Sequence, residues 1–204
     1  MLDTIFYVAI TAEAMSAALA AGRRNMDWFG VCVIACVTAL GGGTVRDLVL
    51  GHYPLVWVEN PYLLVVCCIA AFVPIVMARY MAALRWPFLL LDAVGLATFT
   101  IIGCNVALEM GQQPIIVIVA GLLTGIVGGV LRDILCGDVP LVFSSELYAT
   151  VAIVSGVLYY FGHISDLPHD LVVIGTIAFG FTFRVLAILF KIQMPKFVYD
   201  KELR

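Results

Sequence analysis

Seven long apolar runs divide this sequence, and they constrain its fold more than any other feature. They lie at about 4–22, 28–50, 61–80, 87–109, 113–136, 145–162 and 169–190. Each run is close to the roughly 20 residues that an α-helix needs to span the hydrocarbon core of a bilayer. The content of 63% hydrophobic and 12% charged residues also exceeds what a soluble core of 204 residues could bury. We therefore predict an all-α membrane protein with seven transmembrane helices.

The first run resembles a signal peptide only at its end, which reads ALAAG. It lacks a basic segment in front, opens with Asp3 and contains Glu13, so we interpret it as a retained first helix. The runs are long and do not alternate with a period of two. Helices are therefore favoured over a membrane β-barrel.

A motif with an arginine and an aspartate occurs twice, as GGGTVRDLVLGHYPLV at 41–56 and as GGVLRDILCGDVPLV at 128–142. The two copies align at a constant offset of 86 residues. The identical pairs are Gly42 and Gly128, Gly43 and Gly129, Arg46 and Arg132, Asp47 and Asp133, Gly51 and Gly137, Pro54 and Pro140, and Tyr62 and Tyr148. Three predicted helices separate the copies, and an odd number of crossings reverses the direction of the chain.

The repeat therefore predicts two inverted three-helix units related by a pseudo-twofold axis in the membrane plane. They span about 2–80 and about 87–163, and a seventh helix follows at about 169–190. We expect residues 1–190 to form a single transmembrane domain and residues 191–204 to form a short cytoplasmic tail.

The basic residues of the connections gather on one side of this topology. Eight of the eleven Lys and Arg residues lie in connections or in the tail, and seven crossings place all eight on the same face. They are Arg23, Arg24, Arg79, Arg85, Lys191, Lys196, Lys201 and Arg204. By the positive-inside rule we predict a multi-pass plasma-membrane protein with its N-terminus outside and its C-terminus in the cytoplasm.

The glycine clusters fall about 14 residues into the second and fifth helices, roughly 21 Å along the axis and so near mid-membrane. Adjacent glycines make a helix easier to break, and a break exposes carbonyl groups that suit a cation. We predict that helices 2 and 5 are broken at 41–43 and at 128–129. The alternative is close helix packing alone, which small residues at every fourth position permit. Such residues are Ala35, Ala39 and Gly43 in one copy and Gly121, Gly125 and Gly129 in the other.

Arg46, Asp47, Arg132 and Asp133 place charge inside the predicted membrane, where an arginine near the centre of a helix costs about 2.5–3.5 kcal/mol. Because adjacent residues of a helix point in different directions, we expect each arginine to find a partner other than the next aspartate. One possibility is cross-repeat pairing, Arg46 with Asp133 and Arg132 with Asp47. The other, which we favour, is that each arginine faces freed carbonyls or water in a central cavity.

Three further charges lie within the predicted helices. Glu13 has Phe99 as its repeat equivalent, so it stands outside the symmetric motif; it is either a proton or cation site or a carboxylate in polar surroundings. Asp92 lies about one turn into the fourth helix, where the helix dipole stabilises a carboxylate. Arg184 is expected to snorkel or to pair near the inner face.

Sites for metals and for catalysis are not predicted. Cys32 and Cys36 lack the further ligands of a metal site, and the segment GHISDLPHD at 162–170 is better explained as a solvated loop. We find no nucleophile paired with a base, no phosphate-binding loop and no basic stripe for nucleic acid. We therefore expect neither an enzyme nor a nucleic-acid-binding protein.

The segments TALGGGTVRDLVLG, DAVGLATFT and GLLTGIVGGVLRDILCGDVP together resemble the prokaryotic branch of the trimeric intracellular cation (TRIC) channel family, also catalogued as a glycine transporter domain. The resemblance covers about residues 2–190. It implies a homotrimer in which each subunit carries its own pore for monovalent cations, chiefly potassium. It also implies roles in pore lining or gating for Gly41, Gly42, Gly43, Thr44, Arg46, Asp47, Gly128, Gly129, Arg132 and Asp133. The chain departs from the family pattern at Glu13, Ala17 and Val127.

Three functions agree with these features. The first is a potassium-permeable channel whose partners are copies of itself, membrane lipid and the permeant potassium or sodium ion, with no cofactor. The second is a secondary transporter of a small amino acid such as glycine, in which an arginine binds the substrate carboxylate and Glu13 or an aspartate carries the coupled proton. The third is an assembly protein without flux, which leaves the buried charge unexplained.

Overall fold

The computed structural model describes residues 2–77, 85–144, 147–165 and 167–192, and these residues contain helices and connections but no strand. The long helices are α1 (Leu2–Arg23), α2 (Trp28–Leu50), α4 (Tyr62–Met77), α5 (Arg85–Glu109), α6 (Pro114–Leu135), α8 (Tyr148–His163) and α9 (His169–Phe190). Two short helices of four residues each are α3 (Val56–Glu59) and α7 (Leu141–Ser144).

Five of these helices are long and apolar enough to cross a membrane: α1, α2, α5, α6 and α9. The apolar part of α4 is shorter, and α8 has 16 residues. The chain is therefore a membrane protein, while the count of seven crossings stays a prediction. Of the basic residues used for the predicted orientation, four lie outside the described residues: Arg79, Lys196, Lys201 and Arg204.

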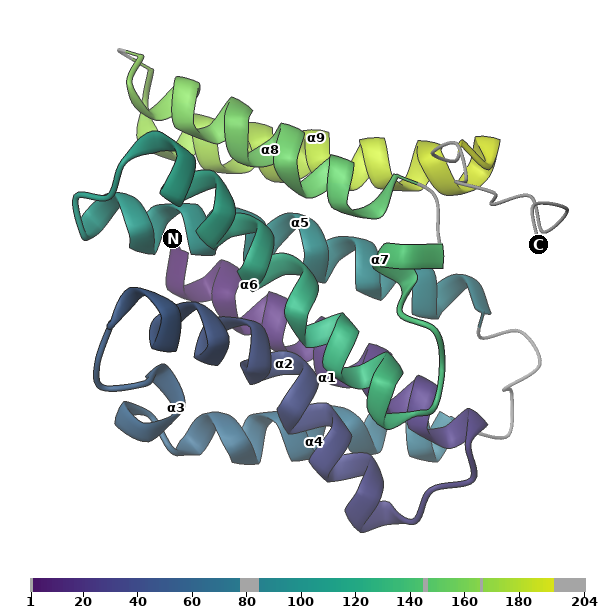
Figure 1. The fold of residues 1–204 in the computed structure, drawn as a ribbon. Coiled ribbons are helices and arrows are strands. Elements are labelled where there is room, and N and C mark those ends of the chain that lie inside the picture. Colours follow the sequence, from purple (N-terminus) through teal and green to yellow (C-terminus); the bar gives the residue numbers. More distant parts are fainter. Residues whose placement is uncertain (1, 78–84, 145–146, 166, 193–204) are drawn as a thin grey trace, which may run out of the picture.

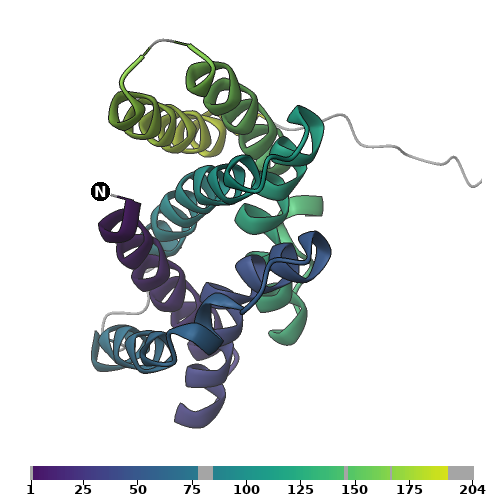
Figure 2. The same ribbon diagram turned by 90° about the vertical axis from the view of Figure 1, so that its left-hand side faces the viewer.

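The two halves of the chain have the same pattern of neighbours. Helix α1 contacts α2 and α4, just as α5 contacts α6 and α8. Helices α2 and α6 contact each other, and α9 packs on α5 and α8. Figure 1 shows α8 and α9 together along one edge and α4 along the opposite edge, and Figure 2 shows α5 and α6 between these two groups. This arrangement is what a twofold relation between the repeats would produce.

Helices α2 and α6 touch through glycines that are repeat equivalents. A Cβ atom on Gly42 would lie 2.3 Å from the carbonyl oxygen of Thr124, and one on Gly128 would lie 2.2 Å from the carbonyl oxygen of Thr38. The two threonines are also separated by the offset of 86 residues. Each donates its hydroxyl proton to the carbonyl oxygen four residues earlier, at 2.7 Å. Backbones this close leave no space for a side chain, so each position requires glycine.

The predicted breaks in these two helices are not confirmed. Helix α2 runs without interruption from Trp28 to Leu50, and α6 does so from Pro114 to Leu135. Figure 1 shows that α2 bends along its length without ending. A glycine inside a helix keeps its peptide hydrogen bonds, and here its missing side chain serves the α2–α6 contact. Close packing, the alternative reading of the sequence, therefore accounts for Gly42 and Gly128.

Both helices that carry the motif end at equivalent glycines. Gly51 has a φ of 69° and Gly137 a φ of 72°, which is the left-handed region that favours glycine. The peptide N–H that follows each glycine donates to the carbonyl of the motif aspartate, from His52 to Asp47 at 2.9 Å and from Asp138 to Asp133 at 2.8 Å. The last turn carrying each arginine and aspartate is thus closed in the same way.

Candidate functional site

Two buried arginine sites lie one helical turn beyond the α2–α6 contact. We call them the Arg46 site, on α2, and the Arg132 site, on α6. The last glycine of each cluster faces the guanidinium group: a Cβ on Gly43 would lie 3.8 Å from Arg46 Nη2, and one on Gly129 would lie 3.6 Å from Arg132 Nη2. Gly42 and Gly128 thus serve the helix contact, and the glycine after each of them makes room beside the charge.

In the Arg46 site, one arginine is paired with the aspartate that follows it. Arg46 is 2% exposed and Asp47 is 1% exposed. Arg46 donates from Nε and Nη2 to Asp47 Oδ1, at 2.9 and 2.7 Å. His52 Nδ1 lies 3.0 Å from the same oxygen. Asp47 Oδ2 is buried and has no hydrogen-bond partner among the described residues, so the carboxylate keeps one free acceptor atom.

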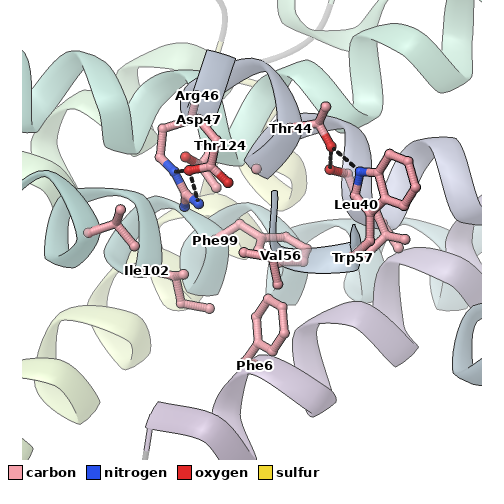
Figure 3. A pocket seen from close by; sticks show the side chains of 13 residues that line it. Phe6, Leu40, Thr44, Arg46, Asp47, Val56, Trp57, Phe99, Ile102 and Thr124 are labelled. Atoms are coloured by element: carbon pink, nitrogen blue, oxygen red, sulfur yellow. Dashed lines mark hydrogen bonds and ion pairs between the residues drawn. The ribbon is translucent and has the colours of Figure 1, made fainter. Parts of the chain in front are cut away.

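A cavity of about 70 Å³ adjoins this pair, which is room for a few water molecules. Its walls come from α1, α2, α3, α5 and α6. They are formed by Phe6, Ala39, Leu40, Gly43, Thr44, Arg46, Asp47, Val56, Trp57, Phe99, Ile102, Val106 and Thr124. Figure 3 shows the Arg46–Asp47 pair on one side of this space and Thr44 with Trp57 on the other. The cavity is therefore mostly apolar, with charge at one wall.

Thr44 links α2 to the short helix α3 at the cavity wall. Its hydroxyl donates to the Leu40 carbonyl at 2.8 Å and accepts from Trp57 Nε1 at 3.1 Å. The neighbouring Gly41 lies toward α6, because a Cβ on it would come within 2.8 Å of Leu131 Cδ1. Thr44 and Gly41 thus take part in packing between elements as well as in lining this region.

In the Arg132 site, a fully buried arginine contacts two carboxylates from different helices. Arg132 donates from Nε to Asp133 Oδ1 at 2.8 Å and from Nη1 to Asp92 Oδ1 at 2.8 Å. Nη1 also donates to Ser16 Oγ at 2.9 Å. The guanidinium carbon lies 4.7 Å from the centre of the Phe88 ring. Arg132 therefore joins α1, α5 and α6 through charged hydrogen bonds.

The same site reaches the short helix α7 through Asp133. Asp133 Oδ2 accepts from the backbone N–H of Leu141, the first residue of α7, at 2.9 Å. One carboxylate thus connects the buried arginine to the chain segment that follows α6.

Glu13 belongs to the Arg132 site by position, although no hydrogen bond joins its carboxyl group to any described residue. It is 3% exposed and interacts electrostatically with Asp92, Arg132 and Asp133. Its carboxyl group lies against the backbone of α5 at Gly95, where a Cβ would come within 1.9 Å of Glu13 Oε1. The site therefore combines one arginine with three carboxyl groups.

The repeat offset relates the surroundings of the two arginines, with opposite chemistry. Residues that line the cavity beside Arg46 have polar equivalents around Arg132. The pairs are Phe6 and Asp92, Phe99 and Glu13, and Ile102 and Ser16. Equivalent positions thus surround Arg46 with apolar side chains and Arg132 with carboxyl and hydroxyl groups.

The expected partners of the arginines were partly wrong: Arg132 does have partners besides the next aspartate, but cross-repeat pairing is not found among the described residues. Each arginine is paired with the aspartate directly after it, because the long arginine side chain folds back along the helix and brings its guanidinium to that carboxylate. Among the described residues no pair joins Arg46 to Asp133 or Arg132 to Asp47. Arg46 does line a cavity, as the favoured alternative held, but the carbonyls of the uninterrupted helix are not freed.

Asp92 differs from its predicted role, and of the two alternatives for Arg184 the structure excludes snorkelling. Asp92 is the eighth residue of α5 and is fully buried against Arg132, so its partner is that arginine rather than the helix N-terminus. Arg184 is fully buried, with its guanidinium carbon 4.7 Å from the centre of the Tyr148 ring, and so does not snorkel. Both side chains reach inward because a buried partner stabilises a charge within an apolar helix bundle.

Several contacts of these sites were missed by sequence reasoning. Ser16 and Phe88 contact Arg132, His52 contacts Asp47, and Trp57 contacts Thr44. The repeat offset pairs Ser16 with Ile102, but it places neither residue beside an arginine. No sequence signal identifies these contacts.

Within the described ranges, no group of three or more His, Cys, Asp or Glu side chains is arranged to hold a metal ion. The rings of His163 and His169 lie 6.2 Å apart. Asp166, which belongs to the same segment, lies outside the described residues.

Apolar helices packed around buried, paired arginines define a multi-pass helical membrane protein. The family model described as Glycine transporter matches residues 3–79 and 89–163. The chain therefore belongs to this family. The two matched segments fall within the two predicted repeats.

Curated relatives and solved structures agree with this assignment. The UPF0126 inner membrane protein YadS of Escherichia coli K12 is 37% identical over 190 residues, which cover 92% of each chain. A UPF0126 membrane protein of Vibrio cholerae is 36% identical over 92% of this chain and 79% of the relative. The structure of the TRIC trimeric intracellular cation channel orthologue from Rhodobacter sphaeroides is 32% identical, with a TM-score of 0.89 over 94% of this chain and 98% of that one. The protein thus has a TRIC-like fold.

Proposed function

We propose that the protein is a potassium-permeable channel for monovalent cations, with a pore in each subunit. The observation that carries the proposal is the cavity of the Arg46 site, which lies among five helices and contains a carboxylate with a free acceptor atom. The likeness to a structure described as a cation channel supports the same function. The ligand is then the permeant potassium or sodium ion, and neither a catalytic group nor a cofactor is needed.

A positive charge in a cation pathway raises the barrier to permeation. In the Arg46 site the guanidinium is held against Asp47, so the pair as a whole carries no net charge. In the Arg132 site three carboxyl groups surround one arginine. We infer that both arginines act in gating or in structure, while Thr44 and Asp47 face the permeating ion. Gly41, Gly42 and Gly128 let the two pore helices approach each other, and Gly43 and Gly129 leave room beside the arginines.

The proposal includes assembly and orientation. We infer a homotrimer in the plasma membrane, in contact with lipid, because the matched structure is described as trimeric and the Escherichia coli relative as an inner membrane protein. The N-terminus is outside and the C-terminus is cytoplasmic, as the distribution of basic residues predicts. Cysteine labelling from each side of intact spheroplasts, at positions added to either terminus of a variant without the native cysteines, tests the orientation.

Single-channel recording of the purified protein tests the function. The protein is placed in planar bilayers with unequal concentrations of potassium chloride on the two sides. Discrete currents that reverse near the potassium equilibrium potential are expected. Replacing potassium by sodium and then by a large organic cation ranks the permeant ions. Currents that reverse near the chloride potential would contradict the proposal.

A secondary transporter of glycine is the second candidate, because the family is described as Glycine transporter and Arg46 lines a cavity. In this candidate the guanidinium binds the substrate carboxylate in place of Asp47. Proteoliposomes loaded with a proton gradient distinguish the two functions. Saturable glycine uptake that collapses with the gradient, in a preparation without channel currents, would replace the channel by the transporter.

A further inference from the structure

The carboxyl group of Glu13 is buried among charged groups and accepts no hydrogen bond from the described residues in this arrangement. Glu13 is 3% exposed, and its Oε2 atom has no hydrogen-bond partner among the described residues. Asp92, which is fully buried, also has one oxygen, Oδ2, without a partner. An ionised carboxylate in such surroundings is strongly disfavoured, and neutralisation by a proton removes the penalty.

The fold provides a specific position for this carboxyl group. Because position 95 has no side chain, Glu13 fits against α5, and a Cβ there would lie 1.9 Å from its Oε1 and 2.5 Å from its Cδ. Gly95 is three residues after Asp92, so both lie on the same face of α5 and are about one turn apart. On α1, Ser16 follows Glu13 by three residues and binds Arg132. Two polar helix faces therefore meet at Arg132.

An ionised Glu13 would add negative charge to a region that already has more aspartates than arginines. Arg132 contacts Asp92 and Asp133, and Glu13 interacts electrostatically with all three. Tyr148 from α8 also interacts with Glu13. One arginine thus faces two aspartates, and an ionised Glu13 would be a third negative charge.

Among the described residues, the titratable and charged groups that interact with Glu13 come from α5, α6 and α8. They are Asp92, Arg132, Asp133 and Tyr148. Helices α2 and α4 also pack on α1, but no charged side chain of theirs is among the groups that interact with Glu13.

We propose that Glu13 is a proton-binding site, occupied by a proton in the arrangement that the structure shows. On release, the O–H bond breaks, the electron pair stays on the carboxylate and the proton passes to water. Arg132 Nη2 is a buried donor without a partner among the described residues, so it is available to the newly ionised carboxylate. Arg132 then has two hydrogen-bonding arrangements: it binds Asp92 when Glu13 is protonated, and it is shared with Glu13 when Glu13 is ionised. Because Asp133 accepts from both Arg132 and the backbone N–H of Leu141, a change in the position of Arg132 reaches the start of α7.

This inference does not depend on cation conduction, so its test measures the proton directly. Infrared spectra of the wild-type protein in liposomes are recorded between neutral and alkaline pH. A protonated carboxyl C=O band should be present at neutral pH and should disappear at alkaline pH. In Glu13→Gln the intensity of this band should be lower by the contribution of one carboxyl group. Glu109→Gln is the matched control, because Glu109 lies at the exposed end of α5 beside Asn105, and its variant should keep the band.

Thermal unfolding supplies a second readout. Glutamate in an unfolded chain ionises above about pH 4.3, so a Glu13 that keeps its proton in the folded protein makes the wild type lose stability with rising pH until the folded protein also releases the proton. The melting temperature of the wild type should therefore fall relative to that of Glu13→Gln from acidic pH through neutral pH and then level off at alkaline pH. The proposal is wrong if the wild-type spectrum has no protonated carboxyl band at neutral pH, or if Glu13→Gln keeps the full band. Absence of the wild-type band overturns the proposal even if the variant does not fold.

Discussion

The Arg46 site and the Arg132 site occupy equivalent positions in the two repeats, yet different contacts stabilise the buried arginine in each. In both, the guanidinium folds back onto the next aspartate and lies beside a glycine. Arg46 has no further carboxylate partner among the described residues, and it adjoins a cavity lined by Phe6 and Phe99. Arg132 has Asp92 and Ser16 as additional partners.

In one copy of the motif the arginine is hydrogen-bonded to three helices, whereas in the other copy the arginine adjoins a cavity. Each charged hydrogen bond of Arg132 ends on a different helix, so the guanidinium ties α1, α5 and α6 together. The Arg46 pair is local to α2, apart from its approach to His52. Movement in the Arg46 site therefore disturbs fewer contacts, and this is the site where we place the permeation pathway.

Removal of the arginines should show the largest difference. Arg132→Ala leaves Asp92 and Asp133 buried without their cation and should destabilise the fold by about 3–5 kcal/mol. Arg46→Ala leaves Asp47 next to a cavity that can hold water and near His52, and we expect about 1–3 kcal/mol. Thermal unfolding in detergent measures both. In bilayers, any surviving Arg132→Ala channels should change in open probability rather than in cation selectivity.

The exposed pair of Arg24 and Asp138 is the control for this comparison. Arg24→Ala should change stability by less than about 1 kcal/mol. Equal losses for Arg46→Ala and Arg132→Ala would contradict the distinction between an anchored and an open site. Unchanged gating with altered selectivity in Arg132→Ala would contradict its structural role.

The glycine contact between α2 and α6 should be equally sensitive from both sides. Gly42→Ala and Gly128→Ala each drive a methyl group into a backbone carbonyl of the facing helix, and each should cost about 1–3 kcal/mol. Gly175→Ala on α9 is the control, because nothing lies within 4 Å of its Cβ position, and it should be neutral or slightly stabilising. Melting temperatures that fall for only one of the two motif variants would show that the contact is not symmetric.

The contact between Glu13 and Gly95 should appear as an energetic coupling between these two positions. Gly95→Ala collides with the Glu13 carboxyl group and should destabilise the wild type, but much less so in a Glu13→Ala background. We expect an interaction energy of about 1–2 kcal/mol from the double-mutant cycle, measured by thermal unfolding. Additive effects would mean that Glu13 does not lie against α5 in solution. The equivalent position in the first repeat is Ala9, which already carries a methyl group.

The link between Thr44 and Trp57 should contribute least. Trp57→Phe introduces the residue that the second repeat has at the equivalent position, Phe143, and removes one hydrogen bond. A loss of about 0.5–1.5 kcal/mol is expected. Thr44→Val removes the same bond from the other side and should not add to the effect of Trp57→Phe. A double variant with the summed loss of both single variants would show that the two side chains act separately.

The sequence predicted well those features that depend on a single segment. The length and hydropathy of the apolar runs indicated membrane helices, and the structure has helices in those places. The offset of 86 residues paired Gly42 with Gly128 and Arg46 with Arg132, and the structure gives each pair the same local contact: the glycines meet a backbone carbonyl of the facing helix, and each arginine pairs with the next aspartate. Sequence spacing could not say whether the glycines break a helix or let two helices meet, because both uses require the same residue.

By itself, therefore, the sequence determined that this chain enters a membrane as helices and that two copies of one charged motif lie within them. Hydrophobic length and internal repetition are properties of the chain alone. Only the tertiary structure decided which carboxylates surround each arginine. Asp92, Glu13 and Ser16 come from other helices, and their approach to Arg132 depends on how those helices pack. Buried charge is stabilised by whichever groups the packing brings within a few ångströms, and no local pattern encodes that choice.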